Sequence, residues 1–141
     1  MLAGMSALLL NIMVHAVALT YFMGTGRWLE ETTVAYRLSP TMYAESKKLK
    51  YRVVLAMTGC LVLLIVTGGF GAAADPASAV GFQGWGGIPP GTIHMLVALT
   101  TMGINLCVNL AEYVAIARNG ELVEMVLSDV RTIRTAKGLE V

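Results

Sequence analysis

Residues Gly91–Arg118, GTIHMLVALTTMGINLCVNLAEYVAIAR, decide the fold because they are apolar enough and long enough to cross a bilayer as one helix. The same stretch carries polar side chains, and a helix that turns by about 100° per residue brings them within about 80° of one another. We name this set the polar stripe: His94, Thr101, Asn105, Asn109 and Glu112. Polar groups are costly in hydrocarbon, so the polar stripe must meet protein, water or a bound cofactor.

The composition indicates a membrane protein. Of 141 residues, 56% are hydrophobic and 13% are charged, whereas charged residues make up about a quarter of a typical soluble domain. The net charge is +1 and no basic face dominates, which argues against a nucleic-acid partner.

Cys60 and Cys107 lie in apolar stretches without metal-ligand spacing, so we interpret them as buried thiols and predict no metal site. Signatures of nucleotide-binding loops, zinc proteases and serine hydrolases are absent, so we predict no catalytic site.

Three apolar runs predict three transmembrane helices, over residues 2–23, 51–73 and 91–118. The first run lacks a basic leader and a clear cleavage site, so we interpret it as a retained span rather than a signal peptide. It contains Asn11 and His15, which are four residues apart and therefore share one face of a helix. We expect this face, like the polar stripe, to point inward.

Helical extensions are predicted beyond the spans. Residues 27–38 contain no strong breaker, so we expect the first helix to continue to about Leu38. Ser39-Pro40 predicts the start of the next helix, with serine as the N-cap and proline in the first turn. After the third span, Asn119-Gly120 predicts a break or C-cap, followed by an amphipathic helix over 120–137 that Gly138 ends.

We therefore expect one all-α integral membrane domain over residues 1–141, with three transmembrane helices, helical cytoplasmic extensions and an amphipathic C-terminal helix. The basic residues set its orientation, because cytoplasmic segments of membrane proteins are enriched in lysine and arginine. All ten lie in the first connection or the tail, and the loop over 75–90 has none. We expect a multi-pass protein of the bacterial inner membrane, and this charge pattern predicts that its N-terminus lies outside, in the periplasm, and its C-terminus in the cytoplasm.

The two histidines suggest a bound cofactor. A three-span chain with inward histidines resembles, in architecture only, the membrane anchor subunits of succinate dehydrogenase and fumarate reductase. This resemblance implies a haem b or quinone site with His15 or His94 as a ligand, and a single histidine also suits a chlorin. At the rise of an α-helix His15 lies about 20 Å from the outer end of its span and His94 about 6 Å. This offset of about 14 Å argues against one haem held by both histidines.

The other polar residues have structural and functional interpretations. His15 is expected to bond to Asn11 or to a neighbouring helix, and His94 to lie near the outer head groups. Glu112 either pairs with a basic residue such as Arg52 or acts as a proton-relay carboxylate. Asn105 and Asn109 either join helices or line a polar cavity.

Three hypotheses for function follow from these residues. Facing polar strips on the first and third spans would be poorly hidden in a lone three-helix chain. We therefore expect a non-catalytic subunit of a larger membrane complex that works in energy conversion or electron transfer. Its polar stripe would dock on partner helices or line a cofactor or quinone pocket. The alternatives are a haem b or quinone-binding electron-transfer anchor and a homo-oligomeric proton- or ion-conducting bundle.

Overall fold

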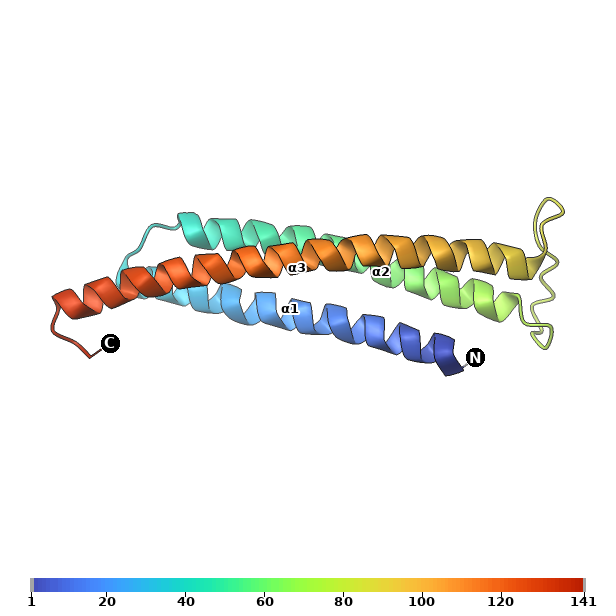
Figure 1. The fold of residues 1–141 in the computed structure, drawn as a ribbon, viewed down its shortest axis with the longest axis horizontal. Coiled ribbons are helices and arrows are strands. Elements are labelled where there is room, and N and C mark those ends of the chain that lie inside the picture. The colour runs from blue at the N-terminus through green and yellow to red at the C-terminus, as the bar shows by residue number, and fades with distance from the viewer. Residues whose placement is uncertain (1, 141) are drawn as a thin grey trace. The chain divides into compact units, whose positions relative to one another are not determined.

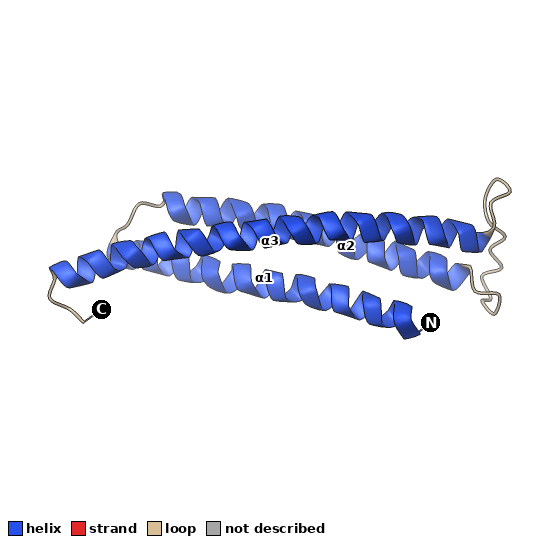
Figure 2. Ribbon diagram, viewed as in Figure 1, coloured by secondary structure: helices blue, strands red, loops and turns tan. Residues whose placement is uncertain are grey.

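The described residues, 2–140 of this computed structural model, form three α-helices and no β-strand (Figure 2). The helices are α1 (Leu2–Tyr36), α2 (Thr41–Ala73) and α3 (Pro90–Ala136), labelled in Figure 1. Each of them is long enough and apolar enough to cross a membrane. The three predicted apolar helices are therefore confirmed.

The connection between α1 and α2 follows the expected punctuation. The α1 helix continues to Tyr36 and ends in two hydrogen bonds of a Schellman motif, from Leu38 N to Thr33 O at 3.0 Å and from Arg37 N to Val34 O at 3.3 Å. Arg37 takes the left-handed conformation of this motif, with φ at 53°. The predicted extension of the first helix is confirmed.

The start of α2 uses both residues of the Ser39-Pro40 pair. Ala44 N donates to Pro40 O at 2.9 Å, which places Pro40 in the first turn. The Ser39 hydroxyl lies 3.0 Å from the Thr41 hydroxyl and accepts weakly from the Thr41 amide at 3.5 Å. A helix start at this pair, with serine at its cap, is confirmed.

The α3 helix is continuous through Asn119-Gly120, so the predicted break there is wrong. The Asn119 side chain does not cap a helix end, because it is used in buried hydrogen bonds to α1 and α2. The predicted end at Gly138 is confirmed. Gly138 has φ at 66° and donates to Thr135 O at 3.0 Å, while Leu139 N donates to Arg134 O at 3.0 Å.

The chain divides into two compact units, Met1–Leu55 with Ala111–Val141, and Ala56–Leu110. In the first unit α1 and α3 run parallel, because their hydrogen-bonded partners are always 94 to 98 positions apart. Buried positions on both helices recur every three or four residues, the spacing of a coiled-coil seam. The buried seam residues of this unit are His15, Ala18, Phe22, Leu29 and Thr33 on α1, Ser46 and Val53 on α2, and Glu112, Ala115, Asn119, Leu122 and Val126 on α3.

The second unit pairs the end of α2 with the start of α3 through a glycine-rich loop. Phe70 of α2 stacks edge-on against Trp85 of the loop, with ring centroids 5.5 Å apart. The turn at Trp85 closes through two hydrogen bonds with Ile88, of 3.3 and 2.9 Å. Gly84 is required here, because its φ is 92° and an added Cβ would lie 2.0 Å from the Ile88 carbonyl oxygen.

Large apolar side chains cover the outer faces of the helices, as lipid contact requires. They include Val17, Leu55, Ile65 and Leu106. Cys60 is buried, whereas Cys107 is exposed, so the prediction of two buried thiols is wrong for Cys107. In a membrane span both the inner and the lipid-facing sides are apolar, so an apolar neighbourhood in the sequence does not identify a buried thiol.

Candidate functional site

A buried histidine–glutamate pair lies in the seam between α1 and α3. His15 Nδ1 and Glu112 Oε1 are 2.6 Å apart, and the two side chains are only 2% and 4% exposed. The prediction that His15 bonds to a neighbouring helix is confirmed, and Asn11 instead donates to Ala7 O in its own helix. The predicted pairing of Glu112 with Arg52 is wrong, because its ion-pair partner is His15. Arg52 lies on an exposed face of α2.

The short distance requires a proton between the two atoms. When the imidazole holds one proton on Nδ1, it donates to the carboxylate and the pair carries a charge of −1. When the pair holds one proton more, its total charge is zero. A charge away from water is costly unless it is paired and hydrogen-bonded. Gain or loss of one proton therefore changes the net charge of this buried pair between zero and −1.

Asn119 forms a second polar cluster further along the same seam. Its side chain is fully buried, and its Oδ1 accepts from the Ser46 hydroxyl at 2.5 Å. Its Nδ2 donates to the Thr25 hydroxyl at 3.0 Å and to the Tyr21 hydroxyl at 3.3 Å. The Tyr21 hydroxyl donates in turn to the Ile116 carbonyl at 3.4 Å. One amide therefore joins α1, α2 and α3 in this unit.

Sequence reasoning missed the Asn119 cluster. Asn119 was interpreted as a helix break because asparagine followed by glycine is a common C-cap pattern. A usable signal was present, since Asn119 follows Glu112 by seven residues, which returns an α-helix to nearly the same face. The polar stripe thus extends one heptad further than its predicted members.

Two arginines of α3, Arg118 and Arg134, make contacts near the surface of this unit. Arg118 donates to Glu45 of α2 at 2.8 Å and to Glu121 at 2.7 Å, and all three groups are partly exposed. Arg134 reaches the Tyr36 hydroxyl at 3.4 Å and the Glu140 carbonyl at 2.8 Å. Arg118 thus ties α3 to α2 through Glu45, and Arg134 ties α3 to the end of α1 through Tyr36.

The members of the polar stripe that lie nearer the start of α3 belong to the second unit. The Thr101 hydroxyl lies 2.7 Å from that of Thr67, which makes a hydrogen bond between α2 and α3. Asn105 is buried and donates to the Thr101 carbonyl of its own helix at 3.0 Å. Asn109 Oδ1 is a buried acceptor without a hydrogen-bond partner in the part of the chain that the structure describes.

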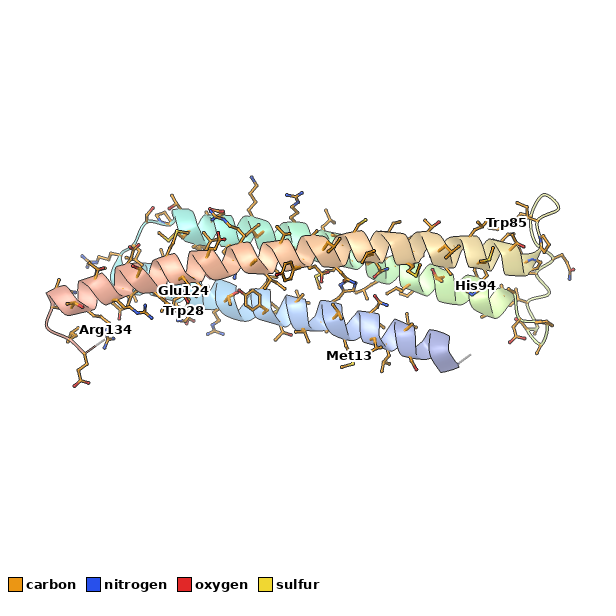
Figure 3. All side chains as sticks on the ribbon, viewed as in Figure 1. Met13, Trp28, Trp85, His94, Glu124 and Arg134 are labelled. Atoms are coloured by element: carbon orange, nitrogen blue, oxygen red, sulfur yellow. The ribbon has the colours of Figure 1, made fainter. Side chains whose placement is uncertain are left out.

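His94 packs against the α2 backbone in this second unit. A Cβ added at Gly71 would lie 3.0 Å from His94 Cε1, so the glycine leaves room for the imidazole ring. The ring is half-buried, and its Nδ1 has no hydrogen-bond partner among residues 2–140. Figure 3 shows His94 near the start of α3 and Trp85 on the preceding loop.

The positions of the two histidines argue against a haem or chlorin bound through His15. His15 has almost no exposed surface and its Nδ1 is engaged with Glu112, so a porphyrin cannot reach its ring without displacing neighbouring side chains. His94 belongs to the other unit. Within residues 2–140, no group of three or more histidine, cysteine, aspartate or glutamate side chains is placed to hold a metal ion.

The expectation that the polar stripe would be poorly hidden in a single chain is wrong for three of its five members, whereas His94 and Asn109 are only partly buried. Thr101, Asn105 and Glu112 are each 5% exposed or less. The structure brings His15 and Glu112 together and leaves His94, Asn105 and Asn109 in the second unit. Comparison with known proteins found no matching family model, curated protein or solved structure.

Proposed function

We propose that this chain is a multi-pass protein of the bacterial inner membrane that serves as a non-catalytic subunit of a larger energy-converting complex. Within that complex, the pair of His15 and Glu112 holds a proton and passes it on. The observation that carries this proposal is the 2.6 Å contact between two ionisable side chains buried in apolar helices. Ionisable groups at such positions are costly, and in membrane proteins they mark proton or ion pathways.

Proton handling fits this site better than ligation of haem or a chlorin. The enclosed imidazole of His15 offers no open face to a macrocycle, whereas its contact with Glu112 needs only a proton. Of the cofactors suggested by the sequence, a quinone suits the proposal best, because its reduction takes up protons. The quinone would be held with a partner subunit, and electron transfer would belong to that partner.

The orientation proposed from charge places the N-terminus outside and the tail in the cytoplasm. The Arg118 and Glu45 ion pair then lies on the cytoplasmic side of the His15–Glu112 pair. The exposed apolar faces are available to lipid and to the helices of other subunits. The sequence carries none of the catalytic motifs considered above, which fits the proposed role of a non-catalytic subunit.

The test is to isolate a tagged full chain from its native membranes in mild detergent and to identify the chains that migrate with it on a native gel. Glu112→Gln is compared with Glu124→Gln, which changes an exposed acid on the same helix. We expect the wild type and both variants to assemble with partners, and only Glu112→Gln to lower the proton-coupled turnover of the complex. A stable monomer without co-purifying chains would defeat the proposal.

A second candidate is a homo-oligomeric proton-conducting bundle. It is favoured by the fact that one chain supplies both ionisable groups of the pair, His15 and Glu112. The purified chain alone would be placed in liposomes that contain a pH-sensitive dye. Proton flux that Glu112→Gln abolishes and Glu124→Gln retains would support this second function. Absence of flux from the wild type would leave the subunit role as the better one.

A further inference from the structure

One face of α2 carries a cluster of exposed cations. Lys47, Lys48 and Arg52 are exposed, whereas Ser46 and Val53 on the opposite side of the helix are buried in the seam. Residues 48 and 52 are four positions apart, so their side chains are neighbours on the helix surface. The positive charge is therefore concentrated on one accessible face of the first unit.

Among the described residues, 2–140, these cations have no acidic ion-pair partner. Arg27 pairs with Glu31 at 2.8 Å, and Arg118 pairs with Glu45 at 2.8 Å. Of the ion pairs formed by residues 2–140, none includes Lys47, Lys48 or Arg52. Arg27 and Arg118 are thus neutralised within the chain, whereas the charge of this cluster is left for an external anion.

The side chains beside this cluster are of the types that are found where a membrane meets water. Tyr51 is 60% exposed between the cations, and Lys50 Nζ lies 5.3 Å from the centroid of its ring. Leu55, one turn after Tyr51, is 77% exposed. Tyrosine is favoured where apolar and aqueous regions meet, and the charged face becomes apolar within this one turn.

We propose that Lys47, Lys48 and Arg52 form a binding site for the head group of an anionic phospholipid, with Tyr51 and Leu55 beside its glycerol and acyl regions. The site rests on the membrane insertion proposed above and not on the proton role of Glu112. Lysine and arginine bind phosphate oxygens through charge-assisted hydrogen bonds. The neighbouring apolar surface favours a lipid over a soluble phosphate, because only a lipid also covers Leu55.

Native mass spectrometry of the delipidated full chain in neutral detergent tests this site. The chain is titrated with phosphatidylglycerol and with phosphatidylcholine of the same acyl chains. The double variant Lys48→Gln/Arg52→Gln is compared with Arg131→Gln/Lys137→Gln, which removes two exposed charges from the tail. Thermal unfolding without added lipid checks that both variants keep the wild-type fold.

We expect the wild type to prefer phosphatidylglycerol. Each charge near an anionic surface is worth about fivefold in affinity, so the first variant should lose about 30-fold and the tail variant much less. Equal losses in both variants would mean that net charge alone attracts the lipid, and equal binding of the two lipids would mean that no head group is recognised. Displacement of phosphatidylglycerol by inorganic phosphate would indicate a soluble ligand. Each of these results overturns the lipid site, even if the chain inserts into membranes and Glu112 handles a proton.

Discussion

The His15–Glu112 pair predicts a strong and asymmetric coupling between two substitutions. His15→Leu removes the imidazole and leaves a carboxyl group whose side chain is 4% exposed without its partner. Breaking a buried ion pair in this way costs about 3–5 kcal/mol. Glu112→Met removes the charge and leaves one ring nitrogen unsatisfied, which costs about 1–3 kcal/mol. Since well-packed apolar replacements of both partners are often neutral, the double variant should lie within about 1 kcal/mol of the wild type.

The coupling is measured by equilibrium unfolding in mixed detergent micelles. Trp28 lies on α1, in the same unit as the pair, whereas Trp85 lies in the other unit. Trp85→Phe therefore leaves one tryptophan that reports on the unit of interest. The four chains of the double-mutant cycle are compared in this background, and circular dichroism checks that each of them keeps its helix content.

The refuting result is additivity. If the two single costs simply add in the double variant, within about 0.5 kcal/mol, the side chains do not interact. The double variant also separates stability from function. We expect it to fold and to assemble like the wild type, yet to lose the proton-coupled activity, because neither leucine nor methionine can hold a proton.

Three further predictions concern the Asn119 cluster, the end of α1 and the loop before α3. Asn119→Ala should destabilise the chain by about 3 kcal/mol because it removes the three hydrogen bonds of a buried amide, each worth about 1 kcal/mol; Ser46→Ala, which removes one of them, should cost about a third as much in the same unfolding assay. Arg37→Gly should stabilise the chain by about 0.5–1 kcal/mol, because the left-handed conformation strains any residue with a side chain; a lower unfolding midpoint would contradict this account of the α1 C-terminus. Gly84→Ala should cost more than about 1 kcal/mol through strain at positive φ, with increased proteolysis of the loop as the readout; unchanged protection would show that the turn relaxes at little cost.

The helices were predictable because their signals are local. Ser39-Pro40 and Gly138 act within a few residues and each apolar run lies within one helix, and the structure confirms all of them. The break at Asn119-Gly120 failed for the opposite reason. The same amide can cap a helix end or bond to Ser46 across the seam, and only the tertiary packing decides between the two.

The sequence predicted which side of its helix each residue of the candidate site occupies, but not which residue on the neighbouring helix it contacts. Helical periodicity places Glu112 on an inward face, yet it carries no information on the register between α1 and α3. The pairing of His15 with Glu112 depends on that register. Thr25 and Ser46 gave no signal at all, because hydroxyl side chains in helices often bond to their own backbone. Thr25 does so as well, donating to the Tyr21 carbonyl at 2.8 Å while it accepts from Asn119.

The Asn119 cluster bears on which of the two proposed functions is better supported. A proton relay needs groups that accept a proton on one side and release one on the other, as hydroxyls, carboxylates, imidazoles and water do. Asn119 instead donates through its Nδ2 and accepts through its Oδ1, and the Tyr21 hydroxyl donates to the Ile116 backbone carbonyl, which ends the chain of donors. Hydrogen bonds on this side of the pair therefore hold the seam together without conducting protons along it. A self-contained bundle would need such a conducting path, whereas a subunit can exchange its proton with groups that a partner supplies, so this geometry favours the role in a complex.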